Sequence, residues 1–206
     1  MITFFNKNIL VVGAKGTAKS LALECAKDRA NMGIFHHDKN ELVEIERELG
    51  NLRIRNYGYK CDMSLPLDIN QAVALYKRQF DSADFVIINI DLHDKEDIIE
   101  TSFEDVRKEI SSSVDGSIFL VKHFLPDIMR KQSGGFVFLV KNGSSSPVGS
   151  AALGAVERFS SSLNSYFRAS GYPEIFSSVI YVSEYKQNTA EQIKKIILSK
   201  KKTARV

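Results

Sequence analysis

Cysteine is scarce in this chain of 206 residues, which has only Cys25 and Cys61. Their separation fits neither a disulfide framework nor a metal-ligand motif, so we expect two reduced, partly buried thiols. The chain also lacks an uncharged apolar run of the roughly 18 residues that a membrane span needs. Its N-terminus shows no signal-peptide pattern. These absences predict a cytoplasmic protein with no part in a membrane.

A strong charge of one sign is missing too, since the formal net charge is +3. The surplus lies near the C-terminus, and we expect a solvated chain end there, with nucleic-acid binding as the lesser alternative. Apolar residues make up 44% and charged residues 26%, as in ordinary globular proteins. The length suits one domain, over residues 1–206. The basic cluster consists of Lys194, Lys195, Lys200, Lys201, Lys202 and Arg205.

Predicted strands and helices alternate along the whole chain. Short β-branched runs such as Lys7–Val12 (KNILVV) are typical of buried parallel strands. Strands joined by helices require right-handed crossovers, so we expect an α/β fold, a doubly wound three-layer sandwich with a mostly parallel six-stranded sheet. The strands are expected at residues 7–12, 32–36, 53–60, 84–90, 136–140 and 175–182. The helices are expected at residues 19–29, 40–49, 69–80, 103–129, 150–169 and 189–198.

Three details of the helices can be predicted. Gly50 follows an amphipathic helix and is expected to be its C-cap. The long segment 103–129 is expected to bend around Asp115 and Gly116. The run Ser160–Ser162 is expected to let its helix pack closely against a neighbour.

A glycine turn follows the first strand, where Gly13-Ala14-Lys15-Gly16-Thr17-Ala18 leads into a helix. Glycine permits a sharp turn and a close approach to a pyrophosphate, whose charge then rests on the amides at the helix start. Two glycines also occur in purely structural turns, so the motif alone is weak. Its place at the first turn of an alternating α/β chain favours nucleotide binding.

At this turn the sequence resembles the short-chain dehydrogenase/reductase family, whose turn reads TGxxxGxG. Here VGAK-GTA is one residue shorter, with Val12 for threonine and Ala18 for the third glycine. Other similar segments follow in the family's order: Cys61-Asp62-Met63 at the adenine contact, DFVIINID (84–91) at the NNAG motif, and FEDVRKEISSSVDGSIFLVKHFLPDIM before GGFVFLV. The resemblance implies a Rossmann-like fold that binds NAD or NADP. The implied cofactor-binding residues are Gly13, Lys15, Gly16, Thr17, Ala18, His37, Asp62, Met63 and Asn89.

Cofactor choice is determined in this family at the end of the second strand, where an acid favours NAD and a base favours NADP. The tip here is His36-His37-Asp38, which fits neither pattern and leaves both cofactors open. Obstruction of the site, by Lys15 or by the shortened loop, is the alternative. Adjacent strand residues point to opposite faces, so we expect no metal site at His36 and His37. His93 and His123 are expected to be surface histidines.

The catalytic pattern of the family is absent. It uses a tyrosine as general acid/base, a lysine four residues later, a serine and an asparagine. No tyrosine of this chain is followed by lysine at the fourth position. The resemblance places Gly149 at the tyrosine, Leu153 at the lysine, Asn142 at the serine and Ser113 at the asparagine. The segment 143–147 lacks a GxSxG elbow and is expected to be a polar loop.

The end of the chain departs from the family as well. The family has a Pro-Gly step, a substrate-covering lid and a seventh strand after the sixth. Tyr181–Tyr185 (YVSEY) contains no Pro-Gly. The remainder is short, so we expect both the lid and the seventh strand to be missing.

Two functions stay open. The first is a non-catalytic dinucleotide-binding or assembly protein. The second is an NAD(P)-dependent oxidoreductase that acts on a small carbonyl or alcohol with an atypical site, for instance with Asn142 orienting the substrate. Family members associate through two long helices, here Phe103–Met129 and Ser150–Ala169, so we expect a homodimer or homotetramer, with a heteromeric partner as the alternative. The second helix has more apolar residues than a solvent-facing helix normally shows, so we expect it to face a partner with Leu153, Val156, Phe159, Leu163 and Phe167.

Overall fold

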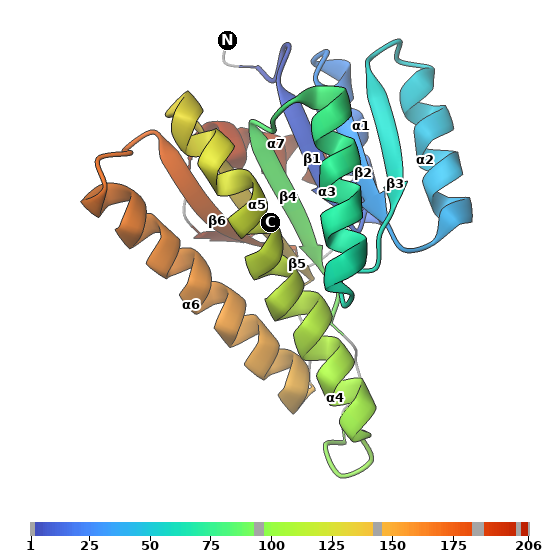
Figure 1. Cartoon of the computed structure of the whole chain (residues 1–206), viewed down its shortest axis with the longest axis vertical. Helices are drawn as coiled ribbons and strands as arrows, with labels where there is room; N and C mark the ends of the chain where they lie inside the picture. The colour runs from blue at the N-terminus through green and yellow to red at the C-terminus, as the bar shows by residue number, and fades with distance from the viewer. Residues whose placement is uncertain (1–2, 93–96, 142–145, 183–187, 201–202, 206) are drawn as a thin grey trace.

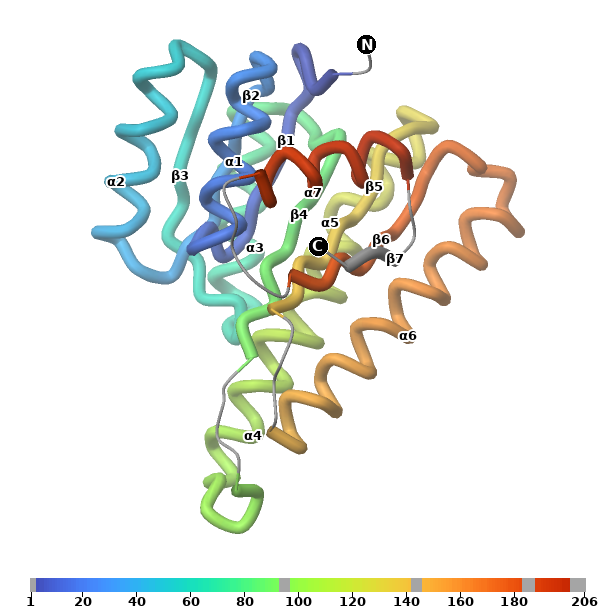
Figure 2. Tube along the Cα trace, turned by 180° about the vertical axis from the view of Figure 1, so that it is seen from behind, coloured from blue at the N-terminus to red at the C-terminus, as the bar shows by residue number. Residues whose placement is uncertain are grey.

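The chain forms three layers around a central sheet. The computed structural model describes residues 3–92, 97–141, 146–182 and 188–200, and the backbone of 203–205. Helices α3 (Pro66–Phe80), α5 (Gly116–Lys131) and α6 (Pro147–Ala169) cover one face, below which α4 (Phe103–Ile110) projects (Figure 1). Helices α1 (Thr17–Lys27), α2 (Lys39–Gly50) and α7 (Thr189–Leu198) cover the other face (Figure 2). Among the described residues, none of these helices is long and apolar enough to cross a bilayer.

The sheet is parallel throughout, in the order β3-β2-β1-β4-β5-β6-β7. Every predicted strand is present, which confirms the Rossmann-like α/β fold. The order reverses between β1 and β4, and at such a switch point the crossovers leave a crevice outside the carboxyl ends of the strands. The strands are β1 (Asn8–Val12), β2 (Asn31–His36), β3 (Asn56–Lys60), β4 (Phe85–Ile90), β5 (Gly134–Lys141), β6 (Ile175–Val182) and β7 (Thr203–Arg205).

The prediction that the seventh strand is missing is wrong. The short strand β7 pairs in parallel with β6, with Val179 opposite Thr203 and Tyr181 opposite Arg205. Once α7 has crossed the sheet, a few residues suffice to reach the open edge of β6, so a short remainder of chain holds a short strand. Residues 183–188 separate β6 from α7. The absence of a lid stays a prediction.

Two apolar cores lie on the two faces of the sheet, because alternate strand residues point to opposite sides. In β1, Leu10 and Val12 belong to the core under α3, α5 and α6, while Ile9 and Val11 belong to the core under α1, α2 and α7. Cys25 and Cys61 are free thiols, as predicted, but they are fully buried on opposite faces.

Helix irregularities match the sequence in one place and not in another. The predicted break in the long helix is a π-helical turn, η1 (Ser111–Asp115), between α4 and α5. The prediction for Gly50 is wrong, because Gly50 is the last residue of α2 and Asn51 takes the C-cap position with a right-handed backbone.

The apolar stripe of α6 does not face a partner as predicted. Val156, Leu163 and Phe167 are buried in the core, and Leu153 and Phe159 pack against it. A 23-residue helix that lies on a sheet turns its most apolar face inward. The outward face of α6 is therefore mainly small and polar.

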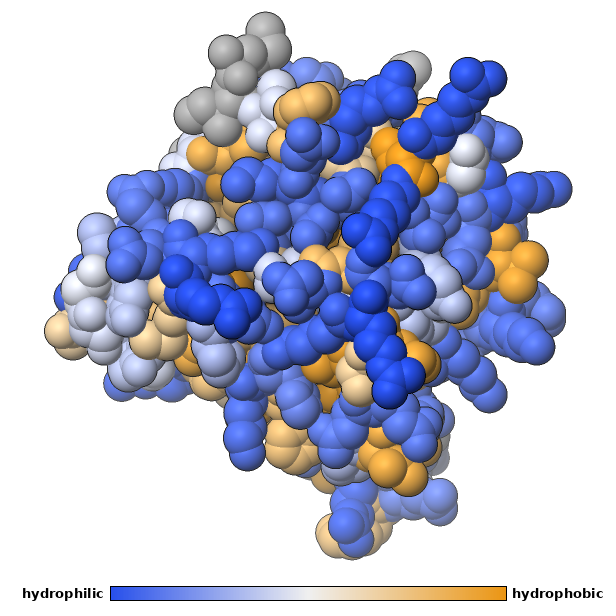
Figure 3. Space-filling view, turned by 45° about the horizontal axis from the view of Figure 1, so that its top comes forward, coloured by the Kyte–Doolittle hydropathy of each residue, from blue (hydrophilic) through white to orange (hydrophobic). Residues whose placement is uncertain are grey.

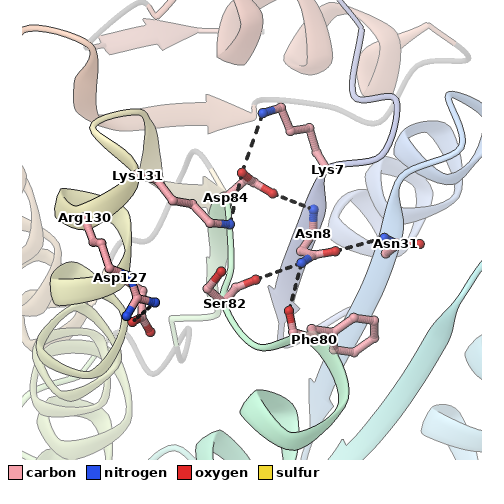
Figure 4. A network of polar contacts seen from close by, with 9 residues as sticks. All are labelled: Lys7, Asn8, Asn31, Phe80, Ser82, Asp84, Asp127, Arg130 and Lys131. Carbon is pink, nitrogen blue, oxygen red and sulfur yellow. Dashed lines mark hydrogen bonds and ion pairs between the residues drawn. The ribbon is translucent and has the colours of Figure 1, made fainter.

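At the end of the sheet away from the crevice, a buried carboxylate joins three elements (Figure 4). Asp84 accepts a hydrogen bond from the Asn8 backbone N–H at 2.8 Å, and its other oxygen lies 3.2 Å from Lys131 Nζ and 3.6 Å from Lys7 Nζ. The contacts connect β1, β4 and the end of α5. They fix the sheet against α5 without contributing to the crevice.

The basic residues near the C-terminus are not simply a solvated end. Lys194 lies on α7 and its Nζ is 3.0 Å from Asp28 and 3.4 Å from Glu24 at the end of α1. Lys200 pairs with Glu174. Lys194 and Lys200 thus attach α7 and the residues after it to acidic residues distant in sequence, whereas Lys195 pairs with Glu191 within α7.

Candidate functional site

A cavity of about 310 Å³ lies at the carboxyl ends of β1, β2, β3 and β4, and α4 with η1 borders it. This is the switch point of the sheet, the usual ligand site of open α/β folds. It combines apolar walls with charged side chains of both signs. The described residues lining the cavity are Val12, Gly13, Lys15, Phe35, His36, His37, Cys61, Asp62, Met63, Ile88, Asn89, Asp91, Lys108, Ser112 and Ser113.

The glycine turn brings backbone rather than side chain to the cavity. Gly13 has φ +67°, and a Cβ there would lie 3.4 Å from both Cβ and O of Asn89. Gly16, the N-cap residue of α1, has φ +51° and no side chain caps the helix. The first turn of α1 has no acidic residue either. Its amides therefore keep the positive end of the helix dipole directed at this corner of the site.

His36 is buried, with 2% of its surface exposed, and both ring nitrogens have partners. The Asp38 backbone N–H donates to Nδ1 at 3.0 Å, so the ring proton is on Nε2, which lies 3.2 Å from Glu41 Oε2. Burial, aided by the neighbouring His37, lowers the pKa of His36. The neutral ring is therefore the form that this site holds.

The two histidine rings do not point to opposite faces as predicted. They stack with centroids 4.9 Å apart and planes 18° apart. The pleat alternates sides only within a strand, and β2 ends at His36, so His37 is free to turn onto its neighbour. The absence of a metal site stays a prediction.

Asp38, the acid at this tip, is occupied elsewhere. Its carboxylate accepts hydrogen bonds from the backbone N–H groups of Asn40 at 2.7 Å and Glu41 at 2.9 Å, which caps α2. These bonds hold the pKa of Asp38 below its usual value. The carboxylate thus stabilises a helix start and is not part of the cavity lining.

The loop after β3 presents Asp62 and Met63. Partial burial raises the pKa of Asp62, but the hydrogen bonds from Ser64 N–H at 2.9 Å and Ser64 Oγ at 2.7 Å outweigh it and leave the pKa lowered. Burial raises the pKa of Cys61 to about 12, so this thiol is not a nucleophile at neutral pH. A Cβ on Gly116 would lie 2.6 Å from the Met63 carbonyl oxygen, which shows how closely the long helix rests on this loop.

The positions that the resemblance assigns to catalysis lie at the far wall of the cavity and on α6. Ser113 lines the cavity, and its Oγ donates to Glu109 Oε1 at 3.4 Å. Gly149 lies in the first turn of α6, where its N–H donates to the capping Ser146 Oγ at 3.3 Å. Leu153 packs against the apolar core. Asn142 and His93 lie outside the described residues, as do residues 143–145 of the polar segment 143–147.

The structure brings most of the implied cofactor residues together. Gly13, Lys15, His37, Asp62, Met63 and Asn89 all line the cavity. In the described part of the chain, Gly16, Thr17 and Ala18 do not, and Ala18, in the first turn of α1, is buried in the core. That any of these residues contacts a nucleotide stays a prediction.

Sequence reasoning missed several polar residues of the cavity, above all Asp91, Lys108 and Ser112. Asp91 directly follows β4, so its place at the end of a predicted strand was a signal that could have identified it. Lys108 and Ser112 are four residues apart, which is one helical face, but no local pattern shows that this face borders a cavity.

Comparison with known proteins shows which family this chain belongs to. The family model for short chain dehydrogenases matches residues 7–171. The chain belongs to the short-chain dehydrogenase family.

Two curated relatives of this short-chain dehydrogenase family member are named for oxidoreductase activity. An uncharacterized oxidoreductase of Schizosaccharomyces pombe is 28% identical over 66% of this chain and 52% of its own length. The 17-beta-hydroxysteroid dehydrogenase 13 of Rattus norvegicus is 23% identical over 64% of this chain and 44% of its own length. The chain thus spans about half the length of the curated relatives it matches.

Solved structures of low identity share the fold. L-sorbose reductase from Gluconobacter frateurii, in complex with NADPH and L-sorbose, superposes with a TM-score of 0.87 at 14% identity, covering 99% of this chain and 96% of that one. The NADH-dependent reductase A1-R', in complex with NAD, has a TM-score of 0.84 at 13% identity, covering 98% of this chain and 95% of that one. At such identities the likeness concerns the fold alone.

Proposed function

We propose that this short-chain dehydrogenase family member binds NAD or NADP in the switch-point cavity and does not transfer hydride. The observation that carries the proposal is a contrast within one site. The cavity keeps the glycine turn, the uncapped start of α1 and Asp62. Gly149 and Leu153, where the family has its acid and its cation, have no side chain able to donate a proton or hold a charge.

The cavity fits the adenosine part of such a cofactor. Gly13 has no side chain, and its positive φ disfavours any residue with one, so the turn stays open to a ligand. Apolar walls formed by Ile88 and Met63 suit a base, and Lys15 supplies positive charge for phosphate. When bound, a nicotinamide cofactor supplies a hydride. The residues of this chain would hold and orient it, and none at the Gly149 position can deliver the accompanying proton.

Between the two cofactors, the end of β2 favours NADP. Asp38 caps α2 through Oδ1 and does not line the cavity, so it is not placed to accept from a ribose diol bound there. Lys15 and His37 both line the cavity and are suited to an additional phosphate. The preference for NADP thus rests both on the lack of an acidic side chain among the described residues at this corner of the cavity and on the presence of Lys15 and His37. We place this role in the cytoplasm, in keeping with two buried free thiols.

The deciding experiment separates binding from turnover. Calorimetric titration with NADPH, NADH and ADP-ribose measures binding, and the absorbance of the reduced nicotinamide is then followed with a panel of small ketones and aldehydes. We expect binding, tightest for NADPH, and no oxidation above background.

Each other outcome has a distinct meaning. Turnover at an enzymatic rate overturns the inactive assignment and supports the oxidoreductase with an atypical site. No binding of any nucleotide overturns the proposal and leaves an assembly protein. The same titrations on a matched pair of glycine variants, given in the Discussion, show whether binding occurs in this cavity.

A further inference from the structure

The described lining of the switch-point cavity comes from one half of the sheet. Its residues lie at or just after the ends of β1, β2, β3 and β4 and on α4 and η1, and none of these described residues lies on β5, β6 or α6. In doubly wound folds a dinucleotide spans two mononucleotide-binding halves across the switch point. A cavity of about 310 Å³ is near the lower limit of small-molecule sites, about 300–1,000 Å³, and suits one nucleotide better than two.

The two ends of the sheet differ in character. The end opposite the cavity is turned toward the viewer in Figure 3, where the surface is mostly hydrophilic and its apolar groups lie in separate patches. The cavity instead combines apolar walls with a few polar groups, which is typical of a ligand site.

At the positions that the resemblance assigns to catalysis, the described side chains offer nothing to the nicotinamide half of a cofactor. Leu153 packs against the apolar core, and the Gly149 N–H donates to Ser146 Oγ in the cap of α6. Neither residue has a side-chain donor or acceptor for a ribose hydroxyl. The described contacts for a dinucleotide therefore lie at the ends of β1–β4.

Asp62 and Lys108 both line this cavity, from two walls. Ser64 N–H and Ser64 Oγ both donate to Asp62 Oδ1, so Asp62 Oδ2 has no hydrogen-bond partner among the described residues. Lys108 is exposed on α4 and forms no ion pair in the same part of the chain. Burial raises the pKa of Asp62, but the hydrogen bonds from Ser64 and then the charges of Lys108 and His37 lower it. Lys108 thus lies within electrostatic reach of this carboxylate, and the cavity presents an available acceptor near an available donor.

Adenine is the purine that matches this pair of side chains. One edge of adenine carries the N6 amino donor next to the N7 acceptor, whereas the same edge of guanine carries two acceptors, O6 and N7. Asp62 Oδ2 can accept from N6, and Lys108 Nζ can donate to N7. With guanine, the Asp62 carboxylate would face another acceptor, so the site disfavours that base.

The phosphates of such a ligand have partners of their own. Lys15 lines the cavity beside Gly13, where the first turn of α1 has no acidic residue and no side-chain cap. The ammonium group and the amides of this turn together attract a 5′-phosphate. The described residues can thus bind base and phosphate without any contribution from nicotinamide.

We propose that this cavity is a site for adenosine phosphates as such, which holds its ligand through the adenine and the phosphates and gains no affinity from nicotinamide. The inference rests on the proposed function, because it concerns the same cavity. It adds Lys108 as a residue that recognises the base. It also makes the protein respond to the amount of adenine nucleotide and not to the oxidation state of nicotinamide.

Calorimetric titrations with adenosine 2′,5′-bisphosphate, ADP, GDP, NADP⁺, NADPH and nicotinamide mononucleotide test the inference. Adenosine 2′,5′-bisphosphate, NADP⁺ and NADPH should bind with dissociation constants within about threefold of one another, since they share the contacting half. Nicotinamide mononucleotide should not bind. GDP should bind at least about tenfold more weakly than ADP, because a matched pair of base contacts discriminates by this amount or more.

Asp62→Asn exchanges the acceptor for a donor. Its amide oxygen can keep the hydrogen bonds from Ser64, and its NH₂ group then takes the place of Oδ2. ADP should bind about tenfold more weakly and GDP more tightly, whereas a merely structural role of Asp62 would weaken both alike. Lys108→Met should weaken ADP binding by about tenfold. Lys122→Met is the matched control and should leave it unchanged, because Lys122 is exposed on α5 and lies outside the cavity.

The outcomes separate this inference from the proposed function. NADPH binding at least about tenfold tighter than adenosine 2′,5′-bisphosphate overturns the inference and leaves the proposed function standing. Binding of the adenosine phosphates without binding of NADPH does the reverse. Equal affinities for ADP and GDP, or equal effects of Lys108→Met and Lys122→Met, overturn the recognition of adenine by Asp62 and Lys108. No binding of any nucleotide overturns both.

Discussion

At the residue scale, His36 shows how a single buried side chain sets the chemistry of the cavity mouth. Its Nδ1 accepts from Asp38 N–H and its Nε2 faces Glu41, so the ring is held in one orientation by groups on the following helix. The same segment provides the cap of α2. Protonation of this ring would place a donor against the Asp38 N–H and would add charge beside His37.

Stability should therefore depend on His36 below neutral pH. Burial lowers the pKa of His36 in the folded protein, so the unfolded chain binds the proton more readily. The contribution is fully present above the unfolded histidine pKa of about 6.5 and is lost as pH falls through the lowered folded pKa. We expect melting temperatures of His36→Asn, whose amide oxygen accepts from the same N–H, to fall less between pH 7.5 and pH 5 than those of the unchanged chain.

His123 provides the comparison. Burial lowers its pKa as well, and Asn70 Oδ1 lies 2.8 Å from its Nε2. A double variant with His123→Gln should show the flattest acid limb. An unchanged pH dependence in both variants would show that carboxylates, not these imidazoles, govern the loss at acid pH.

A second residue-scale prediction concerns glycine and the nucleotide. Gly13→Val puts a branched side chain at φ +67° and against Asn89, so it should cost about 1–2 kcal/mol of stability and weaken NADPH binding at least about tenfold. Gly50→Ala is the matched control. Nothing lies within 4 Å of a Cβ there and its φ is not positive, so stability and affinity should stay within a few tenths of a kcal/mol or improve. Equal affinities in titrations of both variants would place binding outside this cavity.

At the element scale, α6 and β6 are joined by a buried polar network. Ser177 N–H donates to Asn164 Oδ1 at 3.0 Å, and Asn164 Nδ2 donates to the Ser177 carbonyl at 2.7 Å. The described pairing of β7 with β6 runs from Val179 to Tyr181. At Ser177, the amide of Asn164 satisfies both the backbone N–H and the backbone carbonyl. Ser160, predicted to allow close packing, is buried and its Oγ lies 2.7 Å from Ser177 Oγ.

Removing Asn164 should therefore destabilise the fold strongly. Asn164→Ala leaves a buried backbone donor and acceptor of Ser177 without partners, which should cost about 2–4 kcal/mol in urea unfolding. Ser165→Ala changes the next, exposed residue of α6 and should cost less than about 0.5 kcal/mol. Similar midpoints for the two variants would show that water replaces the amide and that the network adds little.

At the scale of the whole molecule, the inactivity that we propose would have more than one cause. At the positions that the resemblance assigns, the family's acid, cation and hydroxyl are replaced together, and groups that act as a unit do not lose activity additively. In addition, residues 183–188 alone separate β6 from α7, so we expect no lid over the site. A site open to water is a poor environment for hydride transfer.

Restoring the catalytic residues alone should thus fail. The variant Gly149→Tyr, Leu153→Lys and Asn142→Ser should fold and still reduce ketones at no more than the background rate with NADPH. Single general acids contribute about 10²- to 10⁴-fold, so even partial repair would be visible in the absorbance of the cofactor. Turnover in this variant would show that the missing side chains were the whole deficiency.

The sequence by itself determined the layers and the order of the elements. Runs such as Ile9–Val12 and the alternation of strands with helices are local properties, and local period fixes which segments are buried strands and which are amphipathic helices. The glycine turn, Asp62 and Asn89 were identifiable because they follow strand ends, and parallel strands bring their carboxyl ends to one edge.

The tertiary structure alone decided what depends on neighbours far away in sequence. Strand β7 forms because the edge of β6 is open to it, and no pattern in three residues reveals that edge. Lys108 joins Asp62 at one cavity only because the long helix crosses the loop after β3. The apolar residues of α6 turned inward, whereas Ile98 and Ile99, which precede the projecting α4, stayed exposed. The hydrophobic effect favours burial of every apolar face of a helix or strand. The path of the whole chain decides which of these faces are buried within the fold and which stay exposed.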